Sequence, residues 1–276
     1  MISERHVLRV PDSDLEQLRS RLRGMRWPVT WPRQGARAGW QAGTDEGELR
    51  RLVGYWADGY DWRFHEAEVN ALPGRVASLD GTDVFYLRFE AERPGALPIV
   101  LTHGWPSSFL ELAGLARRLA VPSRHGGDAG DAFTVIVPAL PGFPLFPQQP
   151  DLPPATPTHE LWHRLMSDEL GFSRYGAHGG DLGAGVTSRL AGAHPEAVAG
   201  IHLLAVADPP GYDPATVTPE EQRYLDEVAA WFADAGGYEH EQMTRPRTLA
   251  YGLSDSPAGL LAWLVEKYRE WSDCDG

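Results

Sequence analysis

The sequence has a single cysteine, Cys274, among its 276 residues. One thiol cannot form a disulfide within the chain, so the composition fits a reducing compartment. No stretch approaches the roughly 18 uninterrupted apolar residues of a membrane span. The amino-terminal residues 1–10 also contain no apolar run long enough for a signal peptide. We therefore expect a cytoplasmic protein that does not bind a membrane.

Basic residues are scarce as well. The sequence has 25 lysines and arginines against 38 aspartates and glutamates, and the only lysine is Lys267. The formal net charge of −13 argues against a nucleic-acid groove, which needs a basic face to displace counterions. A hydrophobic content of 42% instead predicts a folded protein with a sizeable core.

The hydrophobic periodicity divides the chain into three segments. Residues 1–75 predict a mainly helical arm, whose first helix has Ser13 and Glu16 at capping-box spacing. Residues 76–205 alternate short apolar runs with helical patterns, which is typical of an α/β core with helices on both faces of a parallel sheet. Residues 206–276 become helical again.

The middle segment contains five short apolar runs that predict strands. They lie at residues 83–89, 98–102, 133–137, 175–178 and 200–204, with helices predicted at about 107–120, 158–170 and 183–194. In the last segment, helices are predicted at about 218–235 and 256–271.

The sharpest local motif is Gly-Gly-Asp-Leu-Gly at residues 179–183, between a predicted strand and a predicted helix. This is the spacing of a nucleophile elbow, in which Asp181 would be the nucleophile. Gly180 and Gly183 supply the small residues that such a tight turn needs, and a helix N-terminus favours an anion. The plainer alternative is a turn in which Asp181 only caps the helix.

Aspartate at the nucleophile position selects the chemistry. A carboxylate that attacks an ester carbonyl gives an unproductive anhydride, whereas one that attacks an sp³ carbon gives an ester that water can hydrolyse. The leaving group is therefore expected on an alkyl carbon, as an epoxide oxygen or a halide. The nucleophile position thus holds Asp and not Ser.

A second motif follows the predicted strand at residues 98–102. It reads His103-Gly104-Trp105-Pro106. In this fold class the loop after the third strand supplies one backbone N–H of the oxyanion hole, and the residue after the nucleophile supplies the other. The two donors would be Trp105 and Leu182.

These motifs resemble the microsomal-type epoxide hydrolases, which combine an α/β-hydrolase core with an N-terminal arm and a helical lid. The resemblance covers the chain from about residue 5 onward. It rests on Arg26-Trp27-Pro28 and Tyr60-Asp61-Trp62-Arg63 in the arm, the two core motifs with Leu140-Pro141-Gly142-Phe143, and Thr244-Arg245-Pro246 with Glu266-Lys267-Tyr268 in the lid.

The resemblance implies that Asp181 opens an apolar epoxide, and that hydrolysis of the aspartyl ester gives a vicinal diol without any cofactor. Tyr238, six residues before Thr244, matches one of the two lid tyrosines that would protonate the ring oxygen. A phenol suits this task because it donates a proton without carrying charge at neutral pH. An ordinary half-buried aromatic residue is the alternative for Tyr238.

The resemblance leaves the second lid tyrosine, the orienting carboxylate and the histidine base without counterparts. We therefore expect a C-terminally truncated protein that lacks the last strands of its sheet. His103 and His178 are expected to satisfy local hydrogen bonds, and no positioned partner is expected for His163, His194, His202 or His240. No cluster has metal-ligand spacing, so no metal is expected.

Two other functions stay open. A haloalkane dehalogenase would use the same nucleophile, but Leu182 offers no side-chain N–H to a departing halide, and Tyr238 suits an epoxide oxygen better. A non-catalytic remnant follows if the base is truly lost. The expected partners are a small apolar epoxide and water, with no nucleic acid and no membrane.

Overall fold

A computed structural model describes residues 7–29, 39–79, 81–145, 156–205 and 214–274. Contacts between residues divide the chain into two compact units. The first comprises residues 1–9 and 63–208, and the second comprises residues 10–62 and 209–276. The first two helices thus share a unit with the C-terminal helices, instead of forming a separate arm as the sequence pattern suggests.

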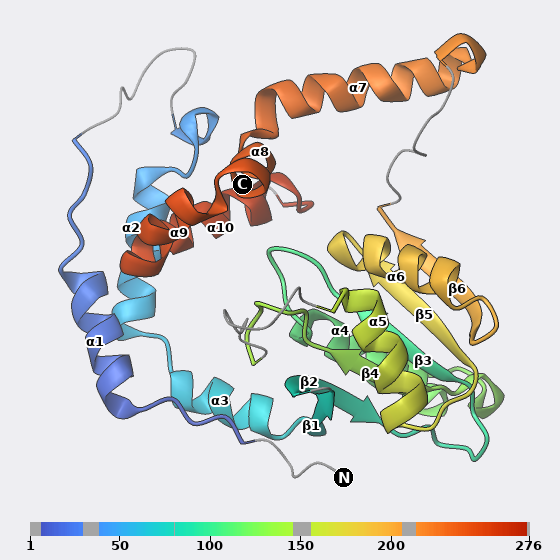
Figure 1. Cartoon of the computed structure of the whole chain (residues 1–276). Coiled ribbons are helices and arrows are strands. Elements are labelled where there is room, and N and C mark those ends of the chain that lie inside the picture. Colours follow the sequence, from blue (N-terminus) through green and yellow to red (C-terminus); the bar gives the residue numbers. More distant parts are fainter. Residues whose placement is uncertain (1–6, 30–38, 80, 146–155, 206–213, 275–276) are drawn as a thin grey trace. The chain divides into compact units, whose positions relative to one another are not determined.

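The first unit is built on a six-stranded mixed sheet (Figure 1). Its strands are β1 (Gly74–Leu79), β2 (Thr82–Phe89), β3 (Pro98–Thr102), β4 (Thr134–Pro138), β5 (Tyr175–Gly180) and β6 (Val198–Leu204). Their spatial order is β1-β2-β4-β3-β5-β6. Strand β2 is antiparallel to both neighbours, whereas β4, β3, β5 and β6 are parallel.

The strand order determines which face each helix covers. The chain passes through α4 (Leu110–Ala120) between β3 and β4, and returns through α5 (Thr158–Arg164) from β4 to β5. These crossovers run in opposite directions along the sheet, so right-handed connections place α4 and α5 on opposite faces. Helix α6 (Leu182–Ala193) follows β5 in the same direction as the α5 crossover, and it packs beside α5 (Figure 1).

This arrangement confirms the expected α/β core covered on both faces. The sheet is parallel only from β4 to β6, because β2 pairs antiparallel with β1 and β4. All five predicted strands are present: the strand at Pro98–Thr102 matches at both ends, and no end of the other four differs by more than two residues. The structure adds β1, which the pattern missed because Arg75 and Ser78 interrupt its apolar positions. It also extends α5 by a π-helical turn, Leu165–Glu169.

The core of the first unit lies on both faces of the central strands. Val100, Ile136 and Val137 are fully buried in the sheet, and Trp162 of α5 is fully buried against it. At the far edge, β6 is exposed along most of its length, with Ile201 44% and Leu204 58% exposed.

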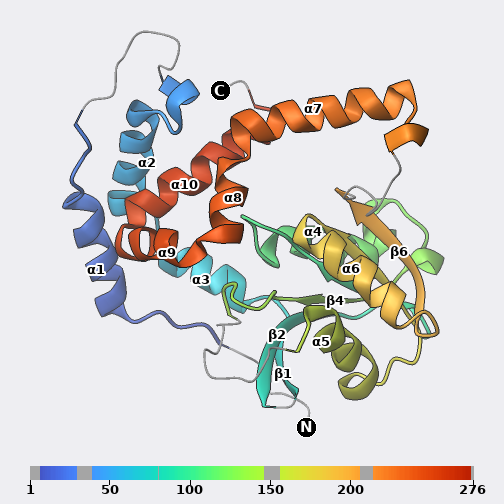
Figure 2. The same ribbon diagram turned by 45° about the horizontal axis from the view of Figure 1, so that its top comes forward.

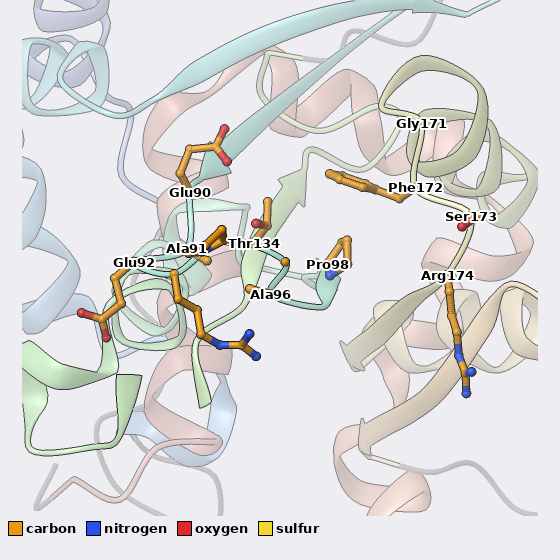
Figure 3. A pocket seen from close by; sticks show the side chains of 13 residues that line it. Glu90, Ala91, Glu92, Ala96, Pro98, Thr134, Gly171, Phe172, Ser173 and Arg174 are labelled. Carbon is orange, nitrogen blue, oxygen red and sulfur yellow. The ribbon is translucent and has the colours of Figure 1, made fainter. Parts of the chain in front are cut away.

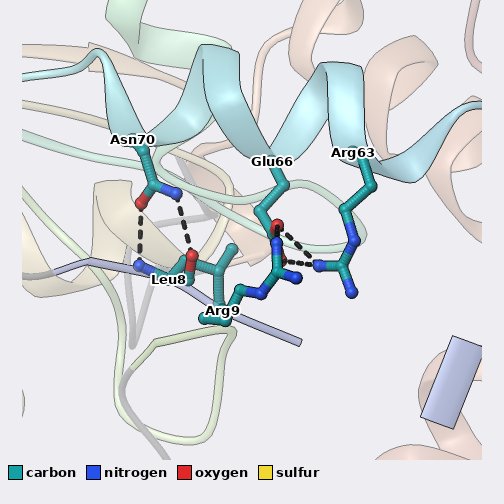
Figure 4. A network of polar contacts seen from close by, with 5 residues as sticks. All are labelled: Leu8, Arg9, Arg63, Glu66 and Asn70. Carbon is teal, nitrogen blue, oxygen red and sulfur yellow. Dashed lines mark hydrogen bonds and ion pairs between the residues drawn. The ribbon is translucent and has the colours of Figure 1, made fainter. Parts of the chain in front are cut away.

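Polar contacts attach the N-terminal residues of the first unit to α3 (Trp62–Asn70), as Figure 4 shows. The Asn70 side chain pairs with both backbone groups of Leu8, at 2.7 and 2.8 Å. Glu66 is 4% exposed and lies 2.6 Å from Arg63 and 3.4 Å from Arg9. Since a buried carboxylate is costly without a charged partner, these arginines make its position tolerable.

The second unit is helical. Its helices are α1 (Asp12–Arg23), α2 (Glu46–Asp58), α7 (Pro219–Ala235), α8 (Gly237–Thr244), α9 (Pro246–Asp255) and α10 (Pro257–Glu270). Leu22, Leu49 and Val53 form one hydrophobic cluster with Ala258 of α10. Two hydrogen bonds reinforce it: Thr44 donates to the carbonyl of Ala262, and Arg21 donates to that of Asp255.

The predicted capping box at the first helix is wrong. Helix α1 begins at Asp12, its cap position is Pro11, and the Ser13 hydroxyl bonds to Asp14 instead of capping the helix. The capping box that does form lies at Thr218 and Glu221, where α7 begins. None of the described helices is long and apolar enough to cross a membrane.

Candidate active site

The candidate site is the tight turn at residues 179–183, here called the Asp181 turn. Strand β5 ends at Gly180 and α6 begins at Leu182, so Asp181 alone makes the reversal between them. Its backbone has φ 52° and ψ −124°, a combination that residues with a side chain rarely adopt. Such strain costs of order 1–3 kcal/mol and persists only where the surroundings enforce it.

Close backbone approaches enforce this turn. A Cβ atom on Gly179 would overlap the carbonyl group of Gly183, and one on Gly183 would overlap that of Thr102 in β3. Gly180 is different, because a Cβ atom there would meet only Leu204 at an ordinary 3.6 Å. The turn therefore requires glycine at positions 179 and 183, the first and last residues of the motif, and not at Gly180, which the sequence analysis expected to be needed.

The loop after β3 lies against the Asp181 carboxylate. The backbone N–H of Trp105 donates to Asp181 Oδ1 at 2.9 Å. Gly104 approaches so closely that a Cβ atom would overlap the Asp181 side chain. The peptide bond between Trp105 and Pro106 is cis. Strands β3 and β5 are hydrogen-bonded neighbours, and this pairing brings residues 76 positions apart into contact.

His103 connects this loop to the loop after β4. Its imidazole is fully buried, and its Nε2 lies 3.0 Å from the backbone N–H of Leu140. Since an amide N–H can only donate, Nε2 must accept, and the ring proton lies on Nδ1, which donates to the Gly104 carbonyl at 3.1 Å. Burial lowers the pKa of His103, which favours this neutral form. The Phe143 ring packs edge-on against it.

The other histidines form pairs. His178 and His202 lie on adjacent strands with their Nδ1 atoms 2.9 Å apart, and burial, then the neighbouring ring, lowers the pKa of His178. His163 stacks on His194 with centroids 3.6 Å apart, and also contacts the Tyr175 hydroxyl at 2.9 Å. The expectation that His163, His194 and His202 have no positioned partner is therefore wrong.

These pairs are separate from the candidate site. Within the described ranges, no hydrogen bond joins a histidine to Asp181. His194 instead lies 3.2 Å from Glu160, and the described residues contain no cluster of three metal-ligating side chains. His103 and His178 satisfy local hydrogen bonds, as expected from their positions.

Tyr238 lies in the second unit, on α8, where it is half-buried among aromatic rings. Trp271 packs edge-on at 5.2 Å between ring centroids, and Trp231 of α7 lies at 6.5 Å. The Lys267 ammonium lies 4.8 Å from the centroid of the Tyr238 ring. Tyr238 thus contacts two other rings, and one of them, Trp271, lies near the same buried ammonium.

A pocket of about 670 Å³ lies at the other end of the sheet (Figure 3). Pro98 and Thr134, the first residues of β3 and β4, line it together with Phe172 and Arg174. In open α/β sheets ligands bind beyond the carboxyl ends of the strands, whereas these are the amino ends. The pocket is therefore distinct from the site at Asp181.

The sheet order and the strand–turn–helix at Asp181 define an α/β-hydrolase fold. Known proteins support this class. The structure of Aspergillus niger epoxide hydrolase matches with a TM-score of 0.80 and 30% identity, over 97% of this chain and 70% of that one. The juvenile hormone epoxide hydrolase structure from Bombyx mori matches with a TM-score of 0.77 and 25% identity, over 98% of this chain and 64% of that one.

The sequence comparisons lead to the family. The family model "Epoxide hydrolase N terminus" matches residues 3–112. A protein of Stigmatella aurantiaca with epoxide hydrolase in its name is 40% identical over 97% of this chain and 60% of its own length. The chain belongs to the epoxide hydrolase family, and it spans about three fifths of the length of the curated relatives it matches.

Proposed function

We propose that the protein opens apolar epoxides, with Asp181 as the nucleophile, as one step of their hydrolysis to vicinal diols. The observation that carries this proposal is the contact between the Asp181 carboxylate and the Trp105 N–H. This donor engages Oδ1, which leaves Oδ2 to attack the epoxide carbon. A fixed carboxylate at a helix N-terminus is also the arrangement in which an anion is favoured.

The same donor supports the second half of the reaction. When water attacks the aspartyl ester, negative charge develops on the carbonyl oxygen, which in this assignment is Oδ1. The Trp105 N–H already lies at this atom, and the Leu182 N–H at the start of α6 is the second proposed donor. A donor that is in place before the charge develops does not need to reorganise during the reaction.

Tyr238 is the proposed proton donor to the epoxide oxygen. Ring opening forms a bond between Oδ2 and carbon, breaks the carbon–oxygen bond of the ring, and needs a proton on the departing oxygen. The phenol supplies it and becomes a phenolate, which regains its proton from water. This assignment rests on the position of Tyr238 before Thr244 in the family motif.

The test is a single-turnover reaction with styrene oxide, quenched in acid and followed by intact mass. We expect an adduct of one epoxide mass on the chain, or its diol product, and neither with Asp181→Asn. Asp168→Asn is the matched control, because it removes an exposed carboxylate of the same unit. Adduct or diol formation that survives in Asp181→Asn overturns the proposal, as does the absence of both from the folded wild-type chain.

A further inference from the structure

The only lysine of the sequence is also one of the least exposed among the charged residues that the structure describes. Lys267 lies on α10 and is 3% exposed. Its ammonium lies 2.9 Å from Glu266 and 3.3 Å from Glu270, carboxylates that are themselves about one third exposed. Burying a lysine is costly, and ion pairs along the same helix reduce this cost without explaining why a cation is there.

The aromatic neighbours of Lys267 suggest its purpose. The ammonium lies 4.8 Å from the centroid of the Tyr238 ring and 5.8 Å from that of Trp271. A cation within about 6 Å of an aromatic face is attracted by the ring electrons. The attraction grows when the ring itself becomes negative, because two opposite charges then interact in a partly desolvated place. Lys267 therefore favours the phenolate of Tyr238 over the phenol.

We infer that Lys267 is a positioning residue that promotes proton donation by Tyr238, through its fixed charge at the tyrosine ring. The inference rests on the proposed function, which makes Tyr238 the proton donor. The ammonium keeps its own proton throughout: the phenol loses its proton to the epoxide oxygen, and the charge left on the ring is the charge that Lys267 stabilises. The two glutamates hold the ammonium in place.

The alternative is that Lys267 only fills space and anchors α10. Buried lysine stems often serve in this way, by covering apolar surface with their methylene groups. The two roles differ in what the charge contributes. An anchoring role needs the stem and its ion pairs, whereas the inferred role needs a positive charge near the Tyr238 ring. Lys267→Met keeps most of the stem and removes the charge, and Lys267→Arg keeps the charge.

The first measurement follows the phenol directly. The chain is labelled with tyrosine carrying ¹³C at Cζ, the Tyr238 signal is assigned with Tyr238→Phe, and its ionisation is followed by NMR against pH. We expect the titration midpoint to rise by about one to two pH units in Lys267→Met. Lys267→Arg should restore it, and Glu270→Gln should lower it, since one negative neighbour is lost. An unchanged midpoint in Lys267→Met overturns the inference.

The matched control is Arg269→Met on the same helix. Its guanidinium lies over the ring of Trp40, 4.6 Å from the centroid. The variant therefore removes a cation from α10 at a ring other than Tyr238. This variant should leave the Tyr238 midpoint unchanged. Thermal unfolding of each variant shows whether it is folded, and an equal shift of the midpoint in Arg269→Met contradicts a specific role of Lys267.

The second measurement separates this inference from the proposed function. Under single-turnover conditions with styrene oxide, the rate of Asp181 alkylation should fall about three- to tenfold in Lys267→Met and recover in Lys267→Arg. If the midpoint shifts but the rates of Lys267→Met and Tyr238→Phe stay at the wild-type value, the electrostatic contact is real and the role proposed for Tyr238 is wrong. If Tyr238→Phe is slow and Lys267→Met is not, the inference fails alone.

Discussion

The Asp181 turn and the rings around Tyr238 position their residues by different means. At the turn, contacts between backbone segments fix the conformation. Adjacent strands and the first turn of α6 approach so closely that two glycines have no room for a side chain. Tyr238 is instead held by side-chain contacts, with two other rings and the Lys267 ammonium. None of the residues of α7, α8 and α9 is buried, so the backbone there is not closely packed. A site built from backbone restricts sequence locally, whereas one built from side chains tolerates many sequences.

Substitution of glycines tests this difference between the two regions most directly. Gly183→Ala places a methyl group against the carbonyl of Thr102, which cannot move without displacing β3. We expect the free energy of unfolding to fall by about 3 kcal/mol or more in denaturant titrations. Two controls have no atom within 4 Å of an added Cβ: Gly185→Ala on α6 and Gly252→Ala on α9. In both controls the free energy of unfolding should rise by up to about 1 kcal/mol. An equal decrease in all three variants would contradict a steric requirement that is specific to the turn.

His103 is a side chain that helps to hold the backbone near the turn, because it joins the loops after β3 and β4. His103→Phe keeps a ring in the cavity but leaves the Leu140 N–H buried without its acceptor. We expect a loss of about 2 kcal/mol in the free energy of unfolding. The exposed His125 provides the control, and His125→Phe should change stability by less than about 0.5 kcal/mol. Equal losses would show that the buried hydrogen bond contributes little.

The pH dependence of stability follows from the same histidine. Burial places its pKa in the folded state below the ordinary value of 6.5, so the unfolded chain binds the proton first as the pH falls. The stabilisation is complete above about pH 6.5 and is lost towards the lower, folded-state value, at up to about 1.4 kcal/mol per pH unit. Unfolding titrations between pH 7 and pH 5 should give a shallower slope for His103→Phe. The same slope in both proteins excludes this explanation.

The strain at Asp181 predicts that glycine at this position gives a more stable protein than alanine, which is the reverse of the usual order. Asp181→Gly relieves the positive φ, whereas Asp181→Ala keeps a Cβ in the same conformation. Both lose the hydrogen bond from Trp105, so their difference isolates the backbone. We expect the glycine variant to be more stable by about 1 kcal/mol, although alanine is normally the more stable choice. An alanine variant that is equally or more stable would mean that the turn is not strained.

An effect of similar size is expected for a buried hydroxyl close to the Asp181 turn. Thr187 on α6 is fully buried, and its Oγ1 has no hydrogen-bond partner within the described parts of the chain. Thr187→Val should therefore raise the free energy of unfolding by about 1 kcal/mol. Thr102→Val is the matched case with the opposite sign, since its hydroxyl accepts from the Trp162 indole at 3.0 Å. Melting temperatures measured by calorimetry that shift in the same direction in both variants would show that hydrogen bonding of the two hydroxyls does not explain their effects on stability.

The same contrast explains what the sequence could predict. The Asp181 turn and the strand before it could be predicted, because small residues are required there at fixed spacing. The pairing of His163 with His194 could not, since these residues are 31 positions apart and meet only when α5 packs on α6. The contact between Lys267 and Tyr238 spans 29 positions across separate helices, and no local pattern indicates it. Strand β1 was missed because its pattern mixes polar and apolar positions.

The most direct test of the proposed function is to locate the covalent bond. The chain is mixed with styrene oxide under single-turnover conditions, quenched in acid, digested and examined by fragmentation mass spectrometry. The account predicts one epoxide mass on the Asp181 side chain and its absence in Asp181→Asn. A label on another residue, or an adduct that persists in Asp181→Asn, would contradict the assignment of Asp181 as the nucleophile.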